Sequence, residues 1–203
     1  MREIEQRLGI ARSTVSRWVR EIELTDHQRE DLQARGESAR VRARRICYLA
    51  RRRRFQEEGR KAAQQGDPIH AAGCMLYWAE GSKTRNTAQI TNADPDVLRF
   101  FVEFLRRYFD VPDDQFRLTC NLFADHLPRQ REVERFWLDT MNLPESCLCK
   151  SIVNVYSKYS QKKRQNRLPY GTTRVSVCRT HIVQHIYGAI QEYGGFDRPE
   201  WLD

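Results

Sequence analysis

The chain has 203 residues, of which 40% are hydrophobic and 31% charged, and its formal net charge at pH 7 is +8. A chain of this length and composition can bury one substantial core together with a small accessory module. It has no uninterrupted apolar run near 18 residues and no signal-peptide pattern, which argues against a membrane partner and predicts a soluble, cytoplasmic protein.

Residues 2–20 predict two short helices joined by a tight turn. Ile4 and Leu8 share one face of a first helix, and Val15 and Trp18 share one face of a second, so we expect these faces to bury against each other. Gly9 lies between the helices, where a tight turn often needs a residue at positive φ.

The remaining surface of the second helix carries side chains that donate hydrogen bonds to base edges or phosphates in a major groove. They are Arg12, Ser13, Thr14, Ser16, Arg17 and Arg20. Residues 1–22 resemble the helix-turn-helix family in its resolvase-like or transposase-like form, which implies that this helix reads double-stranded DNA. An ordinary helical hairpin without DNA contact is the alternative. Family members usually have a further helix packed over the pair. Here a longer upstream chain or residues 26–34 would supply that cover.

Residues 23–66 predict a helical, Arg-rich linker. Thr25 and Gln28 have the spacing of a capping box, which starts a short polar helix. Residues 34–61 hold ten Arg and one Lys against three Glu, so this segment accounts for the whole net charge of +8. Because this segment follows a predicted DNA-binding helix, we expect it to bind DNA phosphates and to release counterions. The residues expected to do so are Arg51, Arg52, Arg53 and Arg54. A solvated helix that links two modules is the alternative.

From about residue 67 the sequence alternates between helical and strand periods. Helices are expected over 70–80, after the N-cap Asp94 and Pro95, around 133–141, and from about 182 to the pair Gly194-Gly195. Strands are expected over 87–91, 116–122, 152–156 and 172–178. The pattern predicts an α+β domain over 67–196, with helices on one face of an antiparallel or mixed sheet, followed by a tail over 197–203.

This order of elements resembles the LAGLIDADG homing-endonuclease fold, which also occurs as a non-cutting domain in some bacterial helix-turn-helix regulators. The motif's helix, which ends in alanine, an acid and glycine, corresponds to Ala79-Glu80-Gly81. Gly73 and Cys74 stand nearest to the small residues that let two such helices cross, and Trp78 replaces the family's aspartate. Because the chain has one such motif, the resemblance implies a homodimer around this helix, with the sheets forming a saddle for DNA.

In the nuclease members of that family, the acid at the position of Glu80 binds a divalent metal. The resemblance therefore implies that Glu80 is the catalytic carboxylate and a magnesium ligand. A basic side chain would neutralise the developing charge, and Lys83, Lys150, Lys158 and Lys162 are the candidates. The alternative is that Glu80 simply ends an exposed helix.

Three further features have weaker implications. The loop over 158–167 includes Lys162, Lys163 and Arg164, and either reaches DNA or is a soluble surface loop. His181 and His185 share a helix face, but without an intervening acid we favour ordinary hydrogen-bonded histidines over zinc ligands. The six cysteines form no CxxC pair, so we expect reduced, mostly buried thiols.

Two functions of different classes follow from these features. The leading prediction is a sequence-specific DNA-binding protein, a transcriptional regulator that needs no cofactor. The alternative is a magnesium-dependent endonuclease that uses Glu80. All of the basic features suit DNA binding, whereas only one carboxylate suits DNA cleavage. We therefore rank DNA binding above nuclease activity.

Overall fold

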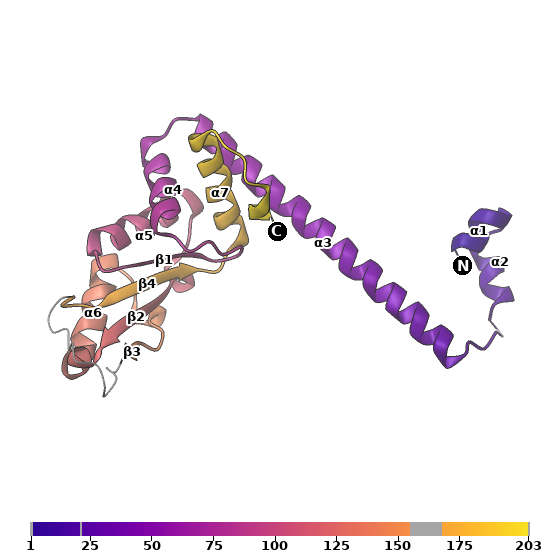
Figure 1. The fold of residues 1–203 in the computed structure, drawn as a ribbon, viewed down its shortest axis with the longest axis horizontal. Helices are drawn as coiled ribbons and strands as arrows, with labels where there is room; N and C mark the ends of the chain where they lie inside the picture. Colours follow the sequence, from indigo (N-terminus) through magenta and orange to yellow (C-terminus); the bar gives the residue numbers. More distant parts are fainter. Residues whose placement is uncertain (1, 21, 155–167, 203) are drawn as a thin grey trace. The chain divides into compact units, whose positions relative to one another are not determined.

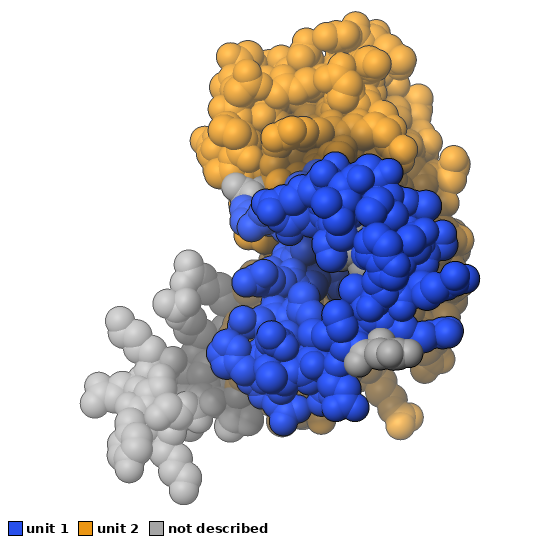
Figure 2. All heavy atoms as spheres, turned by 90° about the vertical axis from the view of Figure 1, so that its right-hand side faces the viewer, with its two compact units in different colours: residues 1–47 blue, residues 48–203 orange. Residues whose placement is uncertain are grey.

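The computed structural model describes residues 2–20, 22–154 and 168–202 (Figure 1). The described residues form seven α-helices and a four-stranded sheet, so the chain has the mixed α+β character expected from its sequence. It divides into two compact units, residues 1–47 and 48–203, which Figure 2 colours separately. None of the described helices combines the length and the apolar character that a membrane span requires.

In the first unit, α1 (Arg2–Leu8) and α2 (Arg12–Trp18) are joined by a short turn. Gly9 has a φ of 63°, a left-handed conformation that glycine adopts without a Cβ penalty. Val15 on α2 is fully buried. The two predicted helices and the turn at Gly9 are therefore confirmed.

We expected the apolar residues of the two helix faces to be buried, and this expectation is wrong for most of these residues. Leu8 and Trp18 are 58% and 56% exposed, and Ile4 is 37% exposed. Two helices of seven residues each have little surface with which to cover one another. Residues 26–34 are exposed throughout, so they do not supply the missing cover.

The basic segment belongs to one continuous helix, α3 (Asp26–Gln64), which spans the boundary between the two units. The predicted capping box is present, because the Thr25 amide donates to Gln28 Oε1 at 3.0 Å and the Gln28 amide donates to Thr25 Oγ1 at 3.3 Å. The short polar helix and the Arg-rich helix, expected as separate elements, are thus a single helix that continues through Gly36.

The second unit contains a sheet of β1 (Ala88–Asn92), β2 (Arg117–Phe123), β3 (Ile152–Asn154) and β4 (Thr172–Val177), in the order β1-β4-β2-β3. Strand β4 runs antiparallel to β1 and β2, and β3 runs parallel to β2, so the sheet is mixed. Val175 lies opposite Ile90 on one side and Leu118 on the other, and all three are buried. One face of the sheet therefore belongs to the core.

Helices α4 (Pro68–Glu80), α5 (Pro95–Phe109) and α7 (Thr180–Gly194) gather beside the sheet, and α6 (Gln130–Met141) packs against α5 (Figure 1). Asp67 and Asp94 cap α4 and α5 by accepting backbone N–H bonds, and each is followed by proline at the first helical position. The cap at Asp94 was expected, whereas α4 begins two residues earlier than the sequence suggested.

Where the second half of α3 crosses α7, the backbones of the two helices lie in contact. A Cβ atom on Gly59 would lie 1.9 Å from the carbonyl oxygen of His185, and one on Gly188 would lie 1.9 Å from that of Gln56. Beside the crossing, buried Gln56 Nε2 donates to Gln184 Oε1 at 2.8 Å. This packing explains why the boundary between the units falls within α3 rather than at residue 67.

The C-terminal residues form structure where a tail was expected. The 3-10 helix η4 (Pro199–Leu202) packs on α7, with the rings of Trp201 and Tyr187 4.5 Å apart. The cysteines are all free thiols, but Cys47 and Cys178 are exposed, so the expected burial holds for only part of the set.

Candidate nucleic-acid interface

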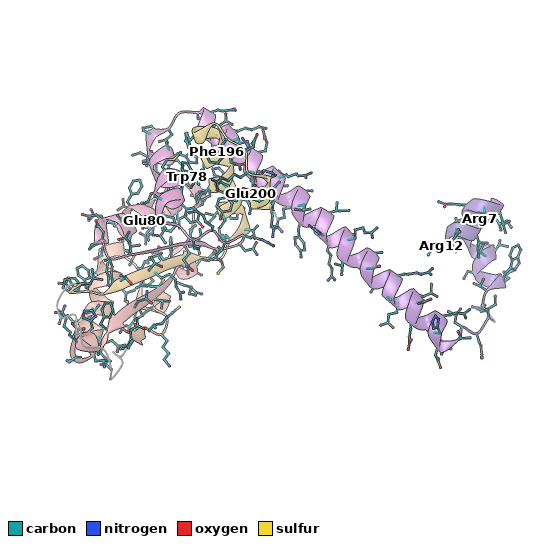
Figure 3. The ribbon with its side chains drawn as sticks, in the orientation of Figure 1. Arg7, Arg12, Trp78, Glu80, Phe196 and Glu200 are labelled. Carbon is teal, nitrogen blue, oxygen red and sulfur yellow. The ribbon has the colours of Figure 1, made fainter. Side chains whose placement is uncertain are left out.

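Helix α2 presents a polar, cationic surface within the first unit. Its residues Arg12, Ser13, Ser16 and Arg17 are exposed, as is Arg20 after its end, while Thr14 is half-buried. Figure 3 labels Arg7 on α1 and Arg12 on α2. Arg7 pairs with Glu3 at 3.0 Å, but no carboxylate among the described residues pairs with an arginine of α2. The guanidinium groups of α2 are therefore available to an external anion.

The four consecutive arginines of α3 differ in what they contact. Arg52 Nη1 donates to the carbonyl oxygen of Leu202 at 2.7 Å, so this side chain is anchored within the second unit. Arg54 pairs with Glu58 at 3.4 Å. Arg51 and Arg54 both lie over the ring of Phe55, and Arg51, Arg53 and Arg54 are all exposed. Tertiary packing thus fixes the position of Arg52, and the expectation that these four arginines contact phosphates stays a prediction.

The sheet has a second, largely polar face, which we call the open sheet face. It follows from strand pleating, because residues that alternate with the buried ones point to the opposite side. Arg174 lies opposite Thr91 on β1 and Thr119 on β2, and its Nη2 donates to Thr119 Oγ1 at 3.2 Å. The remaining polar members are exposed or half-buried, and they are Gln89, Arg117, Asn121, Thr172 and Ser176.

Sequence reasoning identified the strands but did not single out these side chains as a candidate site. The pattern that reveals them was visible, since Arg117, Thr119 and Asn121 alternate with apolar residues along the strand. The sequence alone does not reveal that β2 pairs with β4, and this pairing brings Arg174 beside Thr119. The face gathers amide, hydroxyl and guanidinium groups, the donors and acceptors that contact phosphates and base edges.

Glu80 lies exposed at the end of α4, near the sheet (Figure 3). Asn92 Nδ2 donates to its Oε2 at 3.3 Å. Lys83 Nζ, a candidate for charge neutralisation, instead donates to the carbonyl oxygens of Trp78 and Gly81, each at 2.7 Å, and partial burial lowers its pKa. Lys83 therefore stabilises the end of α4.

In the part of the chain that the structure describes, no group of three or more His, Cys, Asp and Glu side chains is placed to hold a metal ion. Glu80 thus belongs to no such group among the described residues, and a magnesium site at Glu80 would need further oxygen ligands. Of the other basic candidates, Lys150 is exposed. Lys158, Lys162, Lys163 and Arg164 lie outside the described residues.

Helix α4 has an outward apolar face. Ile69 is 39% exposed, Ala72 and Ala79 are exposed, and Leu76 is half-buried. Gly73, expected to approach a second helix of this kind, is buried inside the unit, where an added Cβ would lie 2.2 Å from the Phe104 ring. Cys74 is also buried. The outward face therefore differs from the one expected.

Trp78 lies to one side of that face and packs within the unit. Its ring centroid is 5.3 Å from that of Phe196, which follows α7 (Figure 3). Trp78 is nevertheless 37% exposed, so it is less buried than a core residue.

His185 is a hydrogen-bonded histidine within the packed unit. Its Nε2 lies 3.1 Å from Nε2 of His70, whose Nδ1 lies 2.8 Å from the hydroxyl of Tyr193. Burial, with the neighbouring His70 and His181, lowers the pKa of His185 to about 4. These contacts favour a structural role for His185.

Comparison with models of protein families, with curated proteins and with solved structures finds no match to this chain.

Proposed function

We propose that this chain is a sequence-specific double-stranded DNA-binding protein of the transcriptional-regulator class. The observation that carries the proposal is the surface of α2, where Arg12, Ser13, Ser16 and Arg17 are exposed. Arginine donates two hydrogen bonds to guanine in the major groove, and serine hydroxyls contact bases or phosphates. A helix that displays these groups has the chemistry of a recognition helix.

The open sheet face supports the proposal independently. Arg117 and Arg174 provide positive charge, and the amides of Gln89 and Asn121 provide both donors and acceptors. Two-stranded and larger sheets contact DNA grooves through such side chains. We include in the proposal that this face forms the saddle for DNA that the LAGLIDADG resemblance implies.

We further propose that the protein acts as a homodimer through the outward face of α4. Ile69, Ala72, Leu76 and Ala79 form an apolar strip on one side of this helix. In a two-fold dimer the same patch meets itself, and small residues such as alanine allow two helices to approach closely. A dimer would also present two copies of each DNA-contacting surface, as palindromic sites require.

Selection of bound duplexes from a random pool tests the proposal. We expect the full chain to enrich a defined sequence, and we expect Arg12→Ala and Arg17→Ala to relax its base preference, each by about 1–3 kcal/mol of discrimination. Arg7→Ala is the matched control, because Arg7 is exposed but pairs with Glu3. Failure to bind any duplex at low salt would refute the proposal.

The salt dependence of affinity tests the phosphate interactions separately. Removing one cation that binds a phosphate should reduce the slope of log affinity against log salt by about 0.9. We expect this reduction for Arg53→Ala and for Arg174→Ala. An unchanged slope in both variants would show that neither α3 nor the open sheet face binds phosphates.

A further inference from the structure

A cavity of about 310 Å³ in the second unit has a cationic lining without a carboxylate. Its lining residues are Tyr48, Arg51, Arg52, Asn86 and Thr180. Two other cavities differ in this respect, because both include Glu134 beside their arginines. The residues around the cavity come from α3, from the loop before β1 and from the first turn of α7.

Arg52 is anchored by a hydrogen bond and Arg51 lies over an aromatic ring, and neither arginine has a neutralising partner among the described residues. Arg52 donates to the carbonyl oxygen of Leu202 at 2.7 Å, and the Arg51 guanidinium lies 5.4 Å from the centroid of the Phe55 ring. Within residues 2–20, 22–154 and 168–202, neither arginine forms an ion pair with a carboxylate. Each guanidinium has five N–H donors, so these contacts leave several donors for an anion.

The opposite wall adds neutral donors. Thr180 is the first residue of α7, whose N-cap residue Arg179 makes no side-chain cap and whose first turn has no acidic residue. Thr180 Oγ1 donates to Asn86 Oδ1 at 3.1 Å, which orients the Asn86 amide nitrogen as a further donor. The positive end of the helix dipole adds to the field of the two arginines.

The loop that carries Asn86 is hydrogen-bonded to α7. The hydroxyl of Tyr187 donates to the carbonyl oxygen of Thr84 at 2.9 Å, and Gln184 Nε2 donates to that of Arg85 at 3.3 Å. The Asn86 loop on one wall and Arg52 on the other are therefore held in place before any ligand arrives. A preorganised site avoids the cost of ordering its groups on binding.

We propose that this cavity binds a single phosphate group. Two guanidinium groups, a phenol hydroxyl, an amide nitrogen and a helix N-terminus offer more donors than the two oxygens of a carboxylate accept, and arginine forks match phosphate oxygens in pairs. The phosphate comes either from the DNA backbone or from a free nucleotide. In the first case the cavity deepens the proposed function, and in the second it is a separate ligand site.

Calorimetric titration of inorganic phosphate into the full chain, in low-salt chloride buffer, tests the proposal. We expect saturable binding of one phosphate per chain. Asn86→Asp keeps the acceptor for Thr180 but adds a negative charge to the cavity, and we expect it to weaken binding by about tenfold or more. Gln65→Glu is the matched control, because it adds the same charge at an exposed position outside the lining.

A second pair of variants guards against indirect effects. We expect Arg52→Ala to weaken phosphate binding and Arg99→Ala, which removes the same charge at an exposed position outside the lining, to leave it unchanged. Absence of saturable binding would overturn the proposal. So would equal losses in the lining variants and their controls, because they would indicate general charge attraction.

Competition distinguishes the two sources. If duplex DNA displaces phosphate and Asn86→Asp weakens duplex binding, the cavity holds a backbone phosphate. If a nucleoside 5′-monophosphate displaces phosphate while duplex DNA does not, the cavity is a nucleotide site. If the chain binds no duplex yet binds phosphate with the expected loss in Asn86→Asp, the DNA-binding proposal fails and the phosphate site stands.

Discussion

The Nε2 atoms of His70 and His185 lie 3.1 Å apart, so the two imidazoles share one proton across this contact. His70 belongs to α4 and His185 to α7, and the pair therefore joins two helices of the core. The ring of Phe109 on α5 lies 5.0 Å from that of His185, which excludes water from one side. A second proton would bring two N–H donors face to face and break the contact.

We expect the second unit to lose stability in mild acid. Burial lowers the pKa of His185 from 6.5 to about 4, so between these values the unfolded chain binds more protons than the folded one. The free energy of unfolding should be unaffected by this group above pH 6.5 and should fall by roughly 3 kcal/mol as the pH drops towards 4. Urea denaturation monitored by tryptophan fluorescence at several pH values measures this loss.

Variants separate this effect from general acid denaturation. His185→Gln removes the titrating group and should flatten the loss between pH 6.5 and 4. His27→Gln, which changes an exposed histidine on α3, should leave the pH profile unaltered. Identical profiles for all three proteins would contradict the assignment.

The crossing of α3 and α7 should tolerate no side chain at its two glycines. Gly59→Ala and Gly188→Ala each direct a methyl group at a backbone carbonyl oxygen 1.9 Å away, and we expect a loss of about 2 kcal/mol or more. Gly36→Ala, in the same helix but with no atom within 4 Å of the added Cβ, should instead stabilise α3 by up to about 1 kcal/mol. Urea denaturation followed by far-ultraviolet circular dichroism compares the three variants, and equal effects at Gly36 and Gly59 would disprove the close crossing.

The proposed dimer predicts a change of mass in solution. Leu76→Glu places a charge in the apolar strip of α4 and should convert a dimer into a monomer, as measured by sedimentation equilibrium. Leu127→Glu, at a residue 49% exposed on η2 (Ala124–Arg129), is the control and should leave the mass unchanged. A wild-type chain that is monomeric at every concentration tested would refute dimerisation.

The endonuclease alternative has a direct test. Under the DNA-binding proposal, incubation with supercoiled DNA and magnesium leaves the DNA intact. Nicked product that disappears in Glu80→Ala, and persists in a control such as Glu145→Ala at an exposed residue far along the chain, would establish the nuclease instead.

Local chemistry made several parts of the fold predictable. The capping box of Thr25 and Gln28, the Asp94-Pro95 helix start and the left-handed turn at Gly9 each depend on neighbours within a few residues. The strands were predictable for the same reason, because the alternation of polar and apolar residues is a local pattern. Boundaries shifted by one or two residues, because the ends of strands and helices depend on their pairing partners.

Features that depend on distant partners were not predictable. Arg52 looks like its neighbours in the sequence, yet a carbonyl group 150 residues away fixes it. Gly73 stands near the position of a small residue in the LAGLIDADG pattern, but it contacts Phe104 of its own chain, because α5 packs against it. The phosphate cavity likewise combines α3 with residues from a loop and from α7, a combination that no local pattern encodes.

The paired glycines also set the rotation of the basic helix about its own axis. Successive residues of an α-helix are separated by about 100° around the axis, so one fixed azimuth assigns a direction to each arginine of α3 within the second unit. With Gly59 facing His185 and Gly188 facing Gln56, Arg52 is directed inward and Arg53 outward. Two residues without side chains thus decide that Arg51 and Arg52 line the cavity while Arg53, in the same run of arginines, does not.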